Sequence, residues 1–348
     1  MKRGALRLGL LGCGRIARIF HLPILAAMRG VELAAVAEPD ADARSVAGTR
    51  APGAVAVADW QDVVADPGID AVVVCLPSGM HADAACAAFA AGLHVYLEKP
   101  IATSLEDGCR VLDAWRAGRS VGMAGFDQRF SPAIAALRRE VRAGRVGAAT
   151  GVRLAMGSGR RDSPDWKRSR ATGGGVLLDL GSHMADLARF VLDEEVREVS
   201  AAAASVLSES DTASFAMTLA GGRLAQAWVT LAGITESRLE VVGERGMLVA
   251  DRYAGTLRLH ALEPAWGRVA RAREGLAQVA RGSRELLGVA RPLAIGGTYR
   301  AALEAFAAAA AAGRSAAPDI EDGFRSLAVV LAAEESARTG RAVAPAAP

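Results

Sequence analysis

The sequence LRLGLLGCGRIA, residues 6–17, decides the fold of the N-terminal part of the chain. Its apolar first half, residues 6–11, predicts a buried strand, and Gly12, Gly14 and Ala17 follow it in G-x-G-x-x-A spacing. A helical pattern comes next. A strand, a tight glycine turn and a helix in this order are typical of a dinucleotide-binding turn, because the glycines let a pyrophosphate approach the backbone N–H groups at the helix N-terminus.

A second predicted strand, residues 31–37, ends in Glu38, 21 residues beyond Ala17. An acid at this distance is placed to accept hydrogen bonds from the 2′-OH of a ribose, and its charge would repel a 2′-phosphate. We therefore predict NAD rather than NADP as the cofactor, although Arg44 lies nearby and could soften this preference. The residues expected to form the cofactor-binding turn are Gly12, Gly14, Arg15 and Ile16.

Strand-like and helix-like stretches alternate up to residue 126, with further strands predicted over residues 69–75, 93–97 and 120–126. This alternation favours an α/β fold with a parallel sheet covered by helices on both faces, and we predict a Rossmann domain over residues 1–126. Ligands bind such sheets beyond the carboxyl ends of the strands. The residues at those ends that we expect to contact the cofactor are Glu38, Pro77, His81 and Glu98.

Lys99 stands between Glu98 and Pro100 at the end of a predicted strand. The proline fixes the local backbone, so we expect the lysine side chain to be directed at the site. A cationic nicotinamide beside Lys99 would disfavour the charge of the lysine and lower its pKa. His81 has two open interpretations, a cofactor contact or a structural role in packing the following helix. The histidines expected to be structural are His21 and His94.

A second group of polar residues lies in GGGVLLDLGSHMADLARFVLD, residues 173–193. Asp179 and His183 are four residues apart, so on a helix the acid and the imidazole would share one face. The three glycines before them, residues 173–175, let the backbone pass close to a neighbour because they carry no Cβ. We therefore predict a polar site built into a packed element.

These motifs resemble those of the glucose–fructose oxidoreductase, inositol dehydrogenase and rhizopine-catabolism (Gfo/Idh/MocA) family. The resemblance rests on GCGRIA, Glu38, AGLHVYLEKP at residues 91–100 and GGGVLLDLGSH at residues 173–183. The stretch EDGFRSLAVVLAAEESARTGRAV, residues 321–343, is also similar to the last helix of that family. The resemblance covers essentially the whole chain, with the motifs in the same order.

The resemblance implies an NAD(P)-dependent dehydrogenase or ketoreductase that acts on a secondary hydroxyl or ketone of a sugar, sugar derivative or cyclitol. It also implies that Lys99 binds and relays the proton of the reacting hydroxyl, that Asp179 orients the substrate and that His183 is the general acid/base. An imidazole titrates near neutral pH, and a positioned lysine stabilises a developing alkoxide. Arg129 resembles a residue that faces the substrate pocket, whereas Ser78 replaces an asparagine of many members.

Two other functions stay open beside the dehydrogenase. One is an NAD-dependent glycosidase of the same fold, which oxidises one carbon transiently to permit elimination. The other is a non-catalytic NAD-binding sensor, although a sensor would not need the proton relay of Lys99 and His183.

The second half of the chain, residues 127–348, is predicted to be an α+β domain with a large, mostly antiparallel open sheet. Strand-like stretches recur over residues 149–260, and two helices are expected over residues 298–312 and 320–339. By resemblance, the last helix packs back near the first domain, and the open sheet face forms a homodimer or homotetramer. The final residues, 343–348, are expected to be a loose tail.

Two basic stretches have no settled role in the sequence. GSGRRDSPDWKRSR, residues 157–170, precedes the predicted catalytic helix, and we expect its Trp166 and Lys167 to contact the substrate. Arginines bind anions bidentately, so an anionic sugar is one interpretation of this stretch and a solvated loop is the other. Residues 266–292 have apolar positions at helical spacing, which favours an amphipathic helix on the sheet edge or a partner subunit.

The composition bounds these interpretations. A chain of 348 residues with 51% hydrophobic and 23% charged residues is typical of a globular protein of two domains. A net charge of +3 gives little support for nucleic-acid binding, and no run of 18 apolar residues predicts a membrane span. The four cysteines show no CxxC spacing, so we expect a reduced cytoplasmic protein with no disulfide and no metal site.

Overall fold

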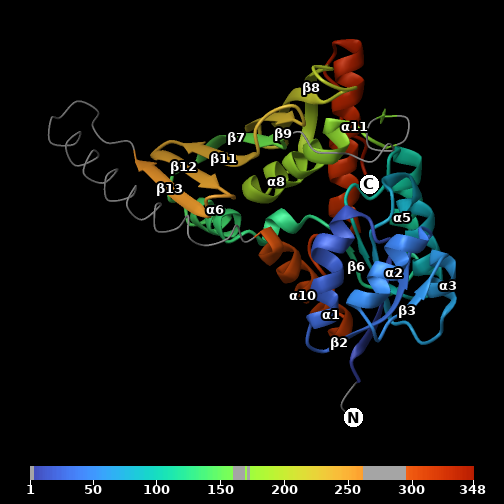
Figure 1. Cartoon of the computed structure of the whole chain (residues 1–348). Coiled ribbons are helices and arrows are strands. Elements are labelled where there is room, and N and C mark those ends of the chain that lie inside the picture. The colour runs from blue at the N-terminus through green and yellow to red at the C-terminus, as the bar shows by residue number, and fades with distance from the viewer. Residues whose placement is uncertain (1–3, 160–168, 171–172, 262–294) are drawn as a thin grey trace.

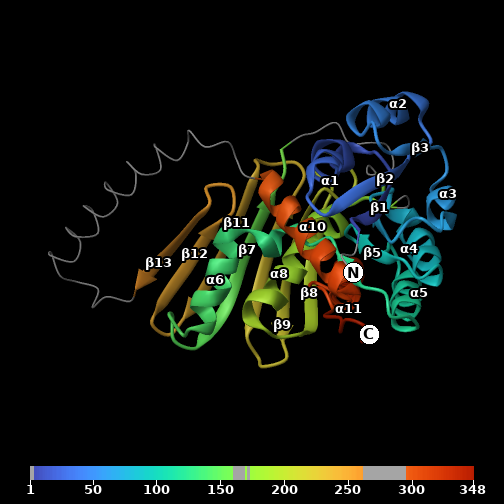
Figure 2. The ribbon, with the colours of Figure 1, turned by 90° about the horizontal axis from the view of Figure 1, so that it is seen from below.

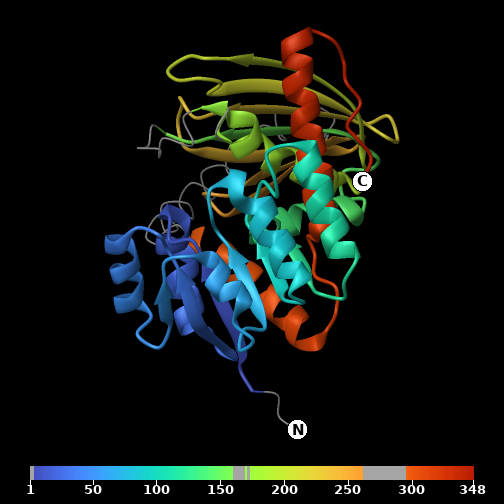
Figure 3. The same ribbon diagram turned by 90° about the vertical axis from the view of Figure 1, so that its right-hand side faces the viewer.

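A computed structural model of the chain describes residues 4–159, 169–170, 173–261 and 295–348. Two sheets organise the molecule, one of six strands in the order β3-β2-β1-β4-β5-β6 and one of seven in the order β13-β12-β11-β7-β10-β9-β8. Figure 3 shows the two sheets one above the other, with the C-terminal helix running along the side of the larger one.

The six-stranded sheet is parallel throughout, with β1 next to both β2 and β4. Its strands are β1 Leu6–Leu11, β2 Val31–Ala37, β3 Val55–Val57, β4 Ala71–Val74, β5 His94–Leu97 and β6 Gly122–Ala124. The predicted Rossmann architecture is confirmed. The sequence analysis missed β3 because this edge strand has only three residues, none of them fully buried, and is too short to show a strand pattern.

Helices follow the strands of this sheet as the alternating pattern predicted. They are η1 Ala17–His21, α1 Leu22–Ala27, α2 Ala41–Arg50, α3 Trp60–Ala65, η2 Ser78–Met80, α4 His81–Ala90 and α5 Leu105–Arg116. The first helix is not regular, because residues 17–21 are wound as a π-helical turn. Side-chain caps fix two of the starts: Asp40 accepts from the N–H of Ala43 at 2.8 Å, and Ser104 from that of Asp107 at 3.1 Å.

The seven-stranded sheet is antiparallel except where β7 and β10 run parallel. Its strands are β7 Ala149–Gly157, β8 Val196–Ala204, β9 Thr212–Leu219, β10 Leu224–Thr230, β11 Glu236–Gly243, β12 Gly246–Asp251 and β13 Thr256–Ala261. Burial alternates along these strands, as it does at Val152, Leu154 and Met156 of β7. One face is therefore packed and the other open, and the predicted mostly antiparallel sheet is confirmed.

Helices cover the packed face of this sheet. The helical elements of the second half are η3 Asp127–Phe130, α6 Pro132–Arg142, η5 Leu177–Gly181, α8 Ser182–Leu192, α10 Ile295–Ala312 and α11 Ile320–Thr339. Figure 2 shows α6 and α8 lying across the strands, and α11 packs against β8 and α8. Helix α8 ends at Asp193, whose φ of 57° is the left-handed conformation of a helix C-cap.

The C-terminal part of the chain returns to the first sheet. Helix α10 lies beside α1 in Figure 1, and its Leu303 and Phe306 are fully buried in one core with Leu8 of β1 and Tyr96 of β5. The rings of Tyr96 and Phe306 meet edge to face at a centroid distance of 5.8 Å. Residues from both halves of the sequence therefore complete the core of the first sheet.

The tail after α11 is tethered at Val343, which corrects the expectation of a loose end for that residue alone, because residues 344–348 form no helix or strand. Val343 donates its N–H to the carbonyl of Val199 at 2.9 Å and accepts from the N–H of Val199 at 2.8 Å. Strand β8 is the edge of its sheet, so the tail satisfies part of an edge that would otherwise expose backbone groups.

Two features do not occur within the residues that the structure describes. No helix there is long and apolar enough to cross a membrane. In the same ranges, no group of three or more His, Cys, Asp or Glu side chains is arranged to hold a metal ion.

Candidate active site

Side chains from the two sheets meet at the candidate active site. The Nζ of Lys99, just after β5, donates to the Oδ1 of Asp179 and to its backbone carbonyl, each at 2.8 Å. Asp179 lies in η5, 80 residues further along the chain. The two side chains are 14% and 23% exposed, so the pair is sheltered and still reachable by a small molecule. The predicted meeting of these two residues is what the structure shows.

Gly173 explains why glycines precede Asp179. Its φ is +93°, and a Cβ there would lie 3.1 Å from the Cγ2 of Thr103 and 3.6 Å from the Cβ of Ser78. A larger residue would therefore push the turn away from the loops that follow β4 and β5. Ser78 is buried against this turn. The close approach brings Asp179 within reach of Lys99.

His183 lies in the first turn of α8 and is 5% exposed. The predicted single helix is a π-helical turn that carries Asp179, followed without a break by the α-helix that carries His183. The imidazole meets the ring of Phe126 edge to face, with centroids 5.9 Å apart. The acid thus lies beside Lys99 at the end of β5, and the imidazole, on the next turn, lies beside Phe126 just after β6.

The charges around Lys99 determine its ionisation. Burial works to lower the pKa of Lys99, but the carboxylate of Asp179 outweighs it, with help from Glu98 and Asp127. The pKa of Lys99 therefore lies above its ordinary value, opposite in direction to the shift expected beside a cationic nicotinamide. In the protein without ligand, Lys99 is an ammonium group and a hydrogen-bond donor.

Glu98 points away from the Nζ of Lys99 and into the protein. Its Oε1 is 2.7 Å from the Nε2 of His21, and its Oε2 accepts from the backbone N–H of Lys99 at 3.2 Å. Burial works to raise the pKa of Glu98, but the hydrogen bond and charge of His21, with Lys99, hold it below its ordinary value. His21 thus has a structural partner, and Glu98 fixes the backbone that carries Lys99.

The glycine turn after β1 fits a dinucleotide. Gly12 has a φ of +92°, and a Cβ there would lie 2.7 Å from the carbonyl oxygen of Cys75, so only glycine passes. At Gly14 a Cβ would meet no atom within 4 Å, which leaves room beside the turn. The carboxylate of Glu38 accepts from the N–H of Cys13 at 2.8 Å and so lies at the edge of this space.

Three other residues complete the surroundings of the turn. Arg15 is exposed and Ile16 half-buried in the first turn of the helix, and Pro77 is half-buried in the loop after β4. Arg44 donates to the backbone carbonyls of Glu38 at 2.6 Å and Pro39 at 2.9 Å. These contacts of Arg44 are to the backbone, and the Glu38 carboxylate is directed at the turn.

The contacts of His81 favour a structural role over a cofactor contact. The ring is 2% exposed, with Nδ1 2.7 Å from the carbonyl of Pro100 and Nε2 2.9 Å from that of Leu76. Burial, the largest influence, lowers the pKa of His81. The side chain therefore braces the loops after β4 and β5 from behind, which corrects the expectation of a cofactor contact.

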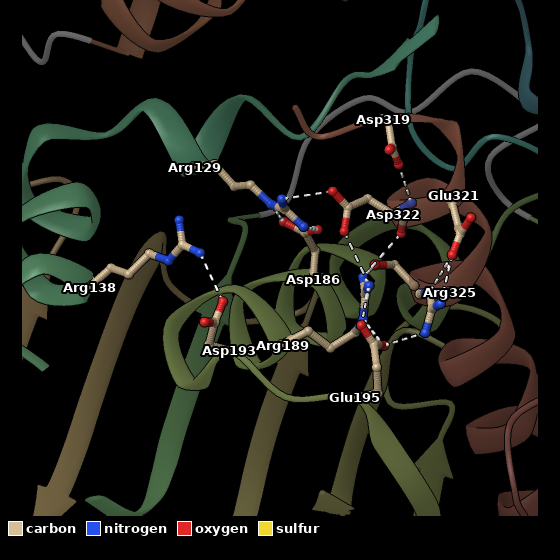
Figure 4. A network of polar contacts seen from close by, with 11 residues as sticks. Arg129, Arg138, Asp186, Arg189, Asp193, Glu195, Asp319, Glu321, Asp322 and Arg325 are labelled. Carbon is tan, nitrogen blue, oxygen red and sulfur yellow. Dashed lines mark hydrogen bonds and ion pairs between the residues drawn. The ribbon is translucent and has the colours of Figure 1, made fainter. Parts of the chain in front are cut away.

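Arg129 also differs from its expected place. Its Nε donates to the Oδ2 of Asp186 at 2.9 Å and its Nη1 to the Oδ2 of Asp322 at 3.0 Å, and its side chain is only 10% exposed (Figure 4). The guanidinium therefore neutralises buried carboxylates. This corrects the expectation that Arg129 faces the substrate.

The basic stretch before the catalytic segment is described only in part. Trp166 and Lys167 lie outside the described residues, as does the whole segment 266–292. Arg170 is described, and it donates to both carboxylate oxygens of Glu334 at 2.7 and 2.8 Å and to the carbonyl of Thr103 at 3.1 Å. Its charge is therefore paired, and it anchors the turn at Gly173.

A buried cluster beneath Lys99 was not anticipated. Asp127 of η3 accepts from the Oγ1 of Thr298 at 2.5 Å and from the Nη2 of Arg252 at 2.9 Å. Burial raises the pKa of Asp127, although Arg252 and Thr298 act against it. The position of Asp127 just after a predicted strand could have suggested it, whereas nothing local to Arg252 predicts this contact.

Two family models match the chain. One, described as the oxidoreductase family with an NAD-binding Rossmann fold, matches residues 6–126, and the other, the GFO/IDH/MocA C-terminal domain, matches residues 134–249. The predicted NAD cofactor is confirmed at this level.

Relatives extend this likeness over most of the chain. The inositol 2-dehydrogenase of Rhizobium meliloti is 32% identical over 258 residues, 70% of this chain and 75% of that protein. The 1,5-anhydro-D-fructose reductase of Ensifer adhaerens is 29% identical over 350 residues, 97% of each. The WlbA dehydrogenase of Bordetella pertussis, solved with NADH and UDP-GlcNAcA, shares the fold over 100% of both chains, with a TM-score of 0.85 at 23% identity. These names are of dehydrogenases and a reductase, which does not favour a glycosidase.

Proposed function

Because the chain belongs to the Gfo/Idh/MocA family of NAD-binding oxidoreductases, we propose that it transfers a hydride between NAD and a secondary hydroxyl or ketone of a sugar, sugar derivative or cyclitol. The observation that carries the proposal is the contact of Lys99 with Asp179 at 2.8 Å, one turn before His183. The relatives are named for inositol and for 1,5-anhydro-D-fructose, which supports a polyhydroxylated ring as the substrate.

The turn at Gly12, Gly14, Arg15 and Ile16 would hold the pyrophosphate of NAD, and Glu38 would accept the ribose hydroxyls. Bound NAD supplies the hydride acceptor or donor, and the chain supplies orientation and proton transfer. A carboxylate at Glu38 disfavours a 2′-phosphate, which supports NAD over NADP.

Lys99 acts on the oxygen of the reacting carbon. As an ammonium group, it donates a hydrogen bond to the substrate hydroxyl and stabilises the negative charge that develops there when the proton leaves. Asp179 holds the Nζ in place before the substrate enters, and it can accept a neighbouring hydroxyl of the ring.

His183 is the proposed general acid/base. In the oxidation direction Lys99 passes one of its protons to the imidazole as it takes up the hydroxyl proton, so the lysine stays an ammonium group, and in the reduction direction the same transfer runs in reverse. The buried position of His183 in the first turn of α8 keeps bulk water from the transferred proton.

The test is a substrate panel with purified protein and NAD, followed by NADH absorbance. Inositols, neutral sugars, sugar phosphates and nucleotide-linked sugars form the panel, and reduction of the matching ketones is measured with NADH. We expect turnover of at least one polyol and its loss in Lys99→Met. Equal kcat/KM for phosphorylated and neutral forms would remove the anionic-substrate alternative. Full turnover by Lys99→Met would contradict the proposed mechanism.

The open face of the seven-stranded sheet supports a homodimer or homotetramer. On β10, Leu224 is 62% and Trp228 46% exposed, and because they are four residues apart they lie on one face. Exposed apolar side chains on an open sheet face favour self-association. Light scattering should show a lower mass for Trp228→Lys than for the unchanged protein, and equal masses would contradict this interface.

A further inference from the structure

The helix that carries His183 also carries a buried carboxylate. Asp186 lies three residues after His183 on α8, so the two side chains leave the helix from adjacent positions on one face. Asp186 is 1% exposed, and a carboxylate so buried requires a counter-charge. The sequence around it, SHMADLARFVL, contains Arg189, but the closest cation in space comes from another element.

That cation is Arg129 of η3. Its Nε reaches both carboxylate oxygens of Asp186, at 3.1 and 2.9 Å, and its Nη2 reaches the Oδ1 at 2.5 Å. A planar guanidinium held by two parallel contacts fixes both distance and rotation, which a lysine in the same place would not do. Arg129 therefore sets how α8 is turned about its axis relative to η3.

The same segment touches His183 directly. Phe126, three residues before Arg129, meets the imidazole edge to face at 5.9 Å, and the Cζ of Arg129 lies 4.8 Å from the ring centroid of Phe190 on α8. The segment thus contacts α8 at the imidazole, at Asp186 and at Phe190. A change at Arg129 must alter the packing between Phe126 and His183.

A second carboxylate holds Arg129 from the other side. The Nη1 of Arg129 donates to Asp322 of α11 at 3.0 Å, and Asp322 in turn accepts from the Nη2 of Arg189 at 3.1 Å. Figure 4 shows these opposite charges alternating between η3, α8 and α11. The position of Arg129 is therefore fixed by two helices, so it can act as a rigid reference for the third contact, the one at His183.

We propose that Arg129 is a positioning residue for His183, acting through its bidentate contact with Asp186 and through Phe126. The proposal rests on the acid/base role of His183 described above. The polar groups of Arg129 are directed at Asp186 and Asp322. Its effect on the reaction passes through the placement of the imidazole.

The first experiment is a double-mutant cycle of Arg129→Lys and His183→Asn. Arg129→Lys keeps the charge and loses the bidentate contact of the guanidinium with Asp186. We therefore expect kcat to fall about 10- to 100-fold, as for a small misplacement of a catalytic group. The Kd for NADH should change less than about twofold, because the glycine turn is remote. In the His183→Asn background the same substitution should change kcat by less than about twofold.

Arg138→Lys is the matched control. Arg138 of α6 also lies over the ring of Phe190, with its Cζ 4.0 Å from the centroid, and pairs with Asp193 at 3.0 Å just beyond the end of α8. The same exchange there changes a similar contact with α8, yet kcat should stay within about twofold. An equal loss of kcat in both variants would show a general weakening of α8 and would overturn the proposal.

A spectroscopic measurement reads the imidazole without turnover. In protein with 15N-labelled histidine, the ring signals of His183 are those absent from His183→Asn. They should move in Arg129→Lys, where the ring of Phe126 is displaced, and stay in Arg138→Lys. Asp322→Asn keeps the bidentate contact of Arg129 with Asp186 and should give a smaller shift of the His183 ring signals. It replaces Arg129→Lys as the test variant if Arg129→Lys does not fold.

The outcomes separate this proposal from the proposed function. Wild-type kcat in His183→Asn would remove the acid/base role and, with it, the need for positioning. A strongly reduced but still measurable kcat in His183→Asn, together with an undiminished effect of Arg129→Lys in that background, would leave the function intact and overturn the role of Arg129. Unmoved ring signals in Arg129→Lys would also overturn it.

Discussion

Two pairs of a cation and an aspartate join Lys99 and Arg129 to residues 173–193, and they are built differently. Lys99 reaches Asp179 with one compact ammonium group, and the two side chains are 14% and 23% exposed. Arg129 holds Asp186 with a planar fork, and these side chains are 10% and 1% exposed. An ammonium can turn from one acceptor to another, whereas a buried fork cannot. Lys99 and Asp179 therefore form an exchangeable pair, in which the lysine can turn to a substrate. Arg129 and Asp186 form a permanent pair, which keeps its elements aligned.

The largest expected effect is on activity at the exchangeable pair. Lys99→Met removes the donor to the developing alkoxide, and we expect kcat to fall about 10²–10⁴-fold. Binding of NADH, measured by fluorescence titration, should change little, and so should the melting temperature. A melting temperature reduced as strongly as in Asp186→Asn would erase the distinction between the pairs.

The next effect is on stability at the permanent pair. Asp186→Asn leaves the buried Arg129 without its main counter-charge, so the free energy of unfolding should fall by about 3–5 kcal/mol. Asp179→Asn, at the more exposed pair, should cost about 1 kcal/mol or less. Urea unfolding of both variants measures this difference, and equal losses would contradict it.

A smaller loss of activity should follow when the ammonium group of Lys99 is replaced by a guanidinium group. Lys99→Arg keeps the charge beside Asp179 but replaces a turning donor with a planar group, so kcat should fall about 10- to 100-fold. Stability in urea should stay within about 1 kcal/mol. Full activity in Lys99→Arg would mean that charge alone suffices at this position.

The smallest effect concerns pH. The pKa of Lys99 is raised in the folded protein, so its contribution is fully present below the pKa of an unfolded lysine, about 10.4. This contribution falls as pH rises through the folded-state value. The stability difference between the unchanged protein and Lys99→Met should therefore be constant from pH 6 to 9 and shrink above about pH 10.4. A difference that shrinks on acidification instead would contradict the sign of the shift.

The sequence predicted what local patterns determine. Residues 6–11 and 31–37 form the strands expected of their apolar runs, and the glycine turn lies between them and a helix. Lys99 and Asp179 meet because each follows a motif that fixes its own element, and His183 follows Asp179 by one helical turn. The resemblance to a family then supplied which elements face each other, which no local pattern could.

The misses arise where a partner is distant in sequence or has no distinctive side chain. Arg129 pairs with residues 57 and 193 positions away, so its neutralised state leaves no local signal. His81 bonds to backbone carbonyls, which every residue carries, and both interpretations were therefore open. Val343 pairs with β8 through its backbone as well, and its proline-rich surroundings concealed this contact.

The return of α10 to the first sheet has a consequence for synthesis of the chain. The ribosome releases β1 first, but Phe306, which covers Tyr96 in that core, follows Tyr96 by 210 residues. Until then, one apolar face of the nascent Rossmann sheet stays in water, where it is exposed to aggregation. The first sheet to leave the ribosome is thus among the last parts to be completed, and nascent chains stalled before residue 295 should be targets for chaperones.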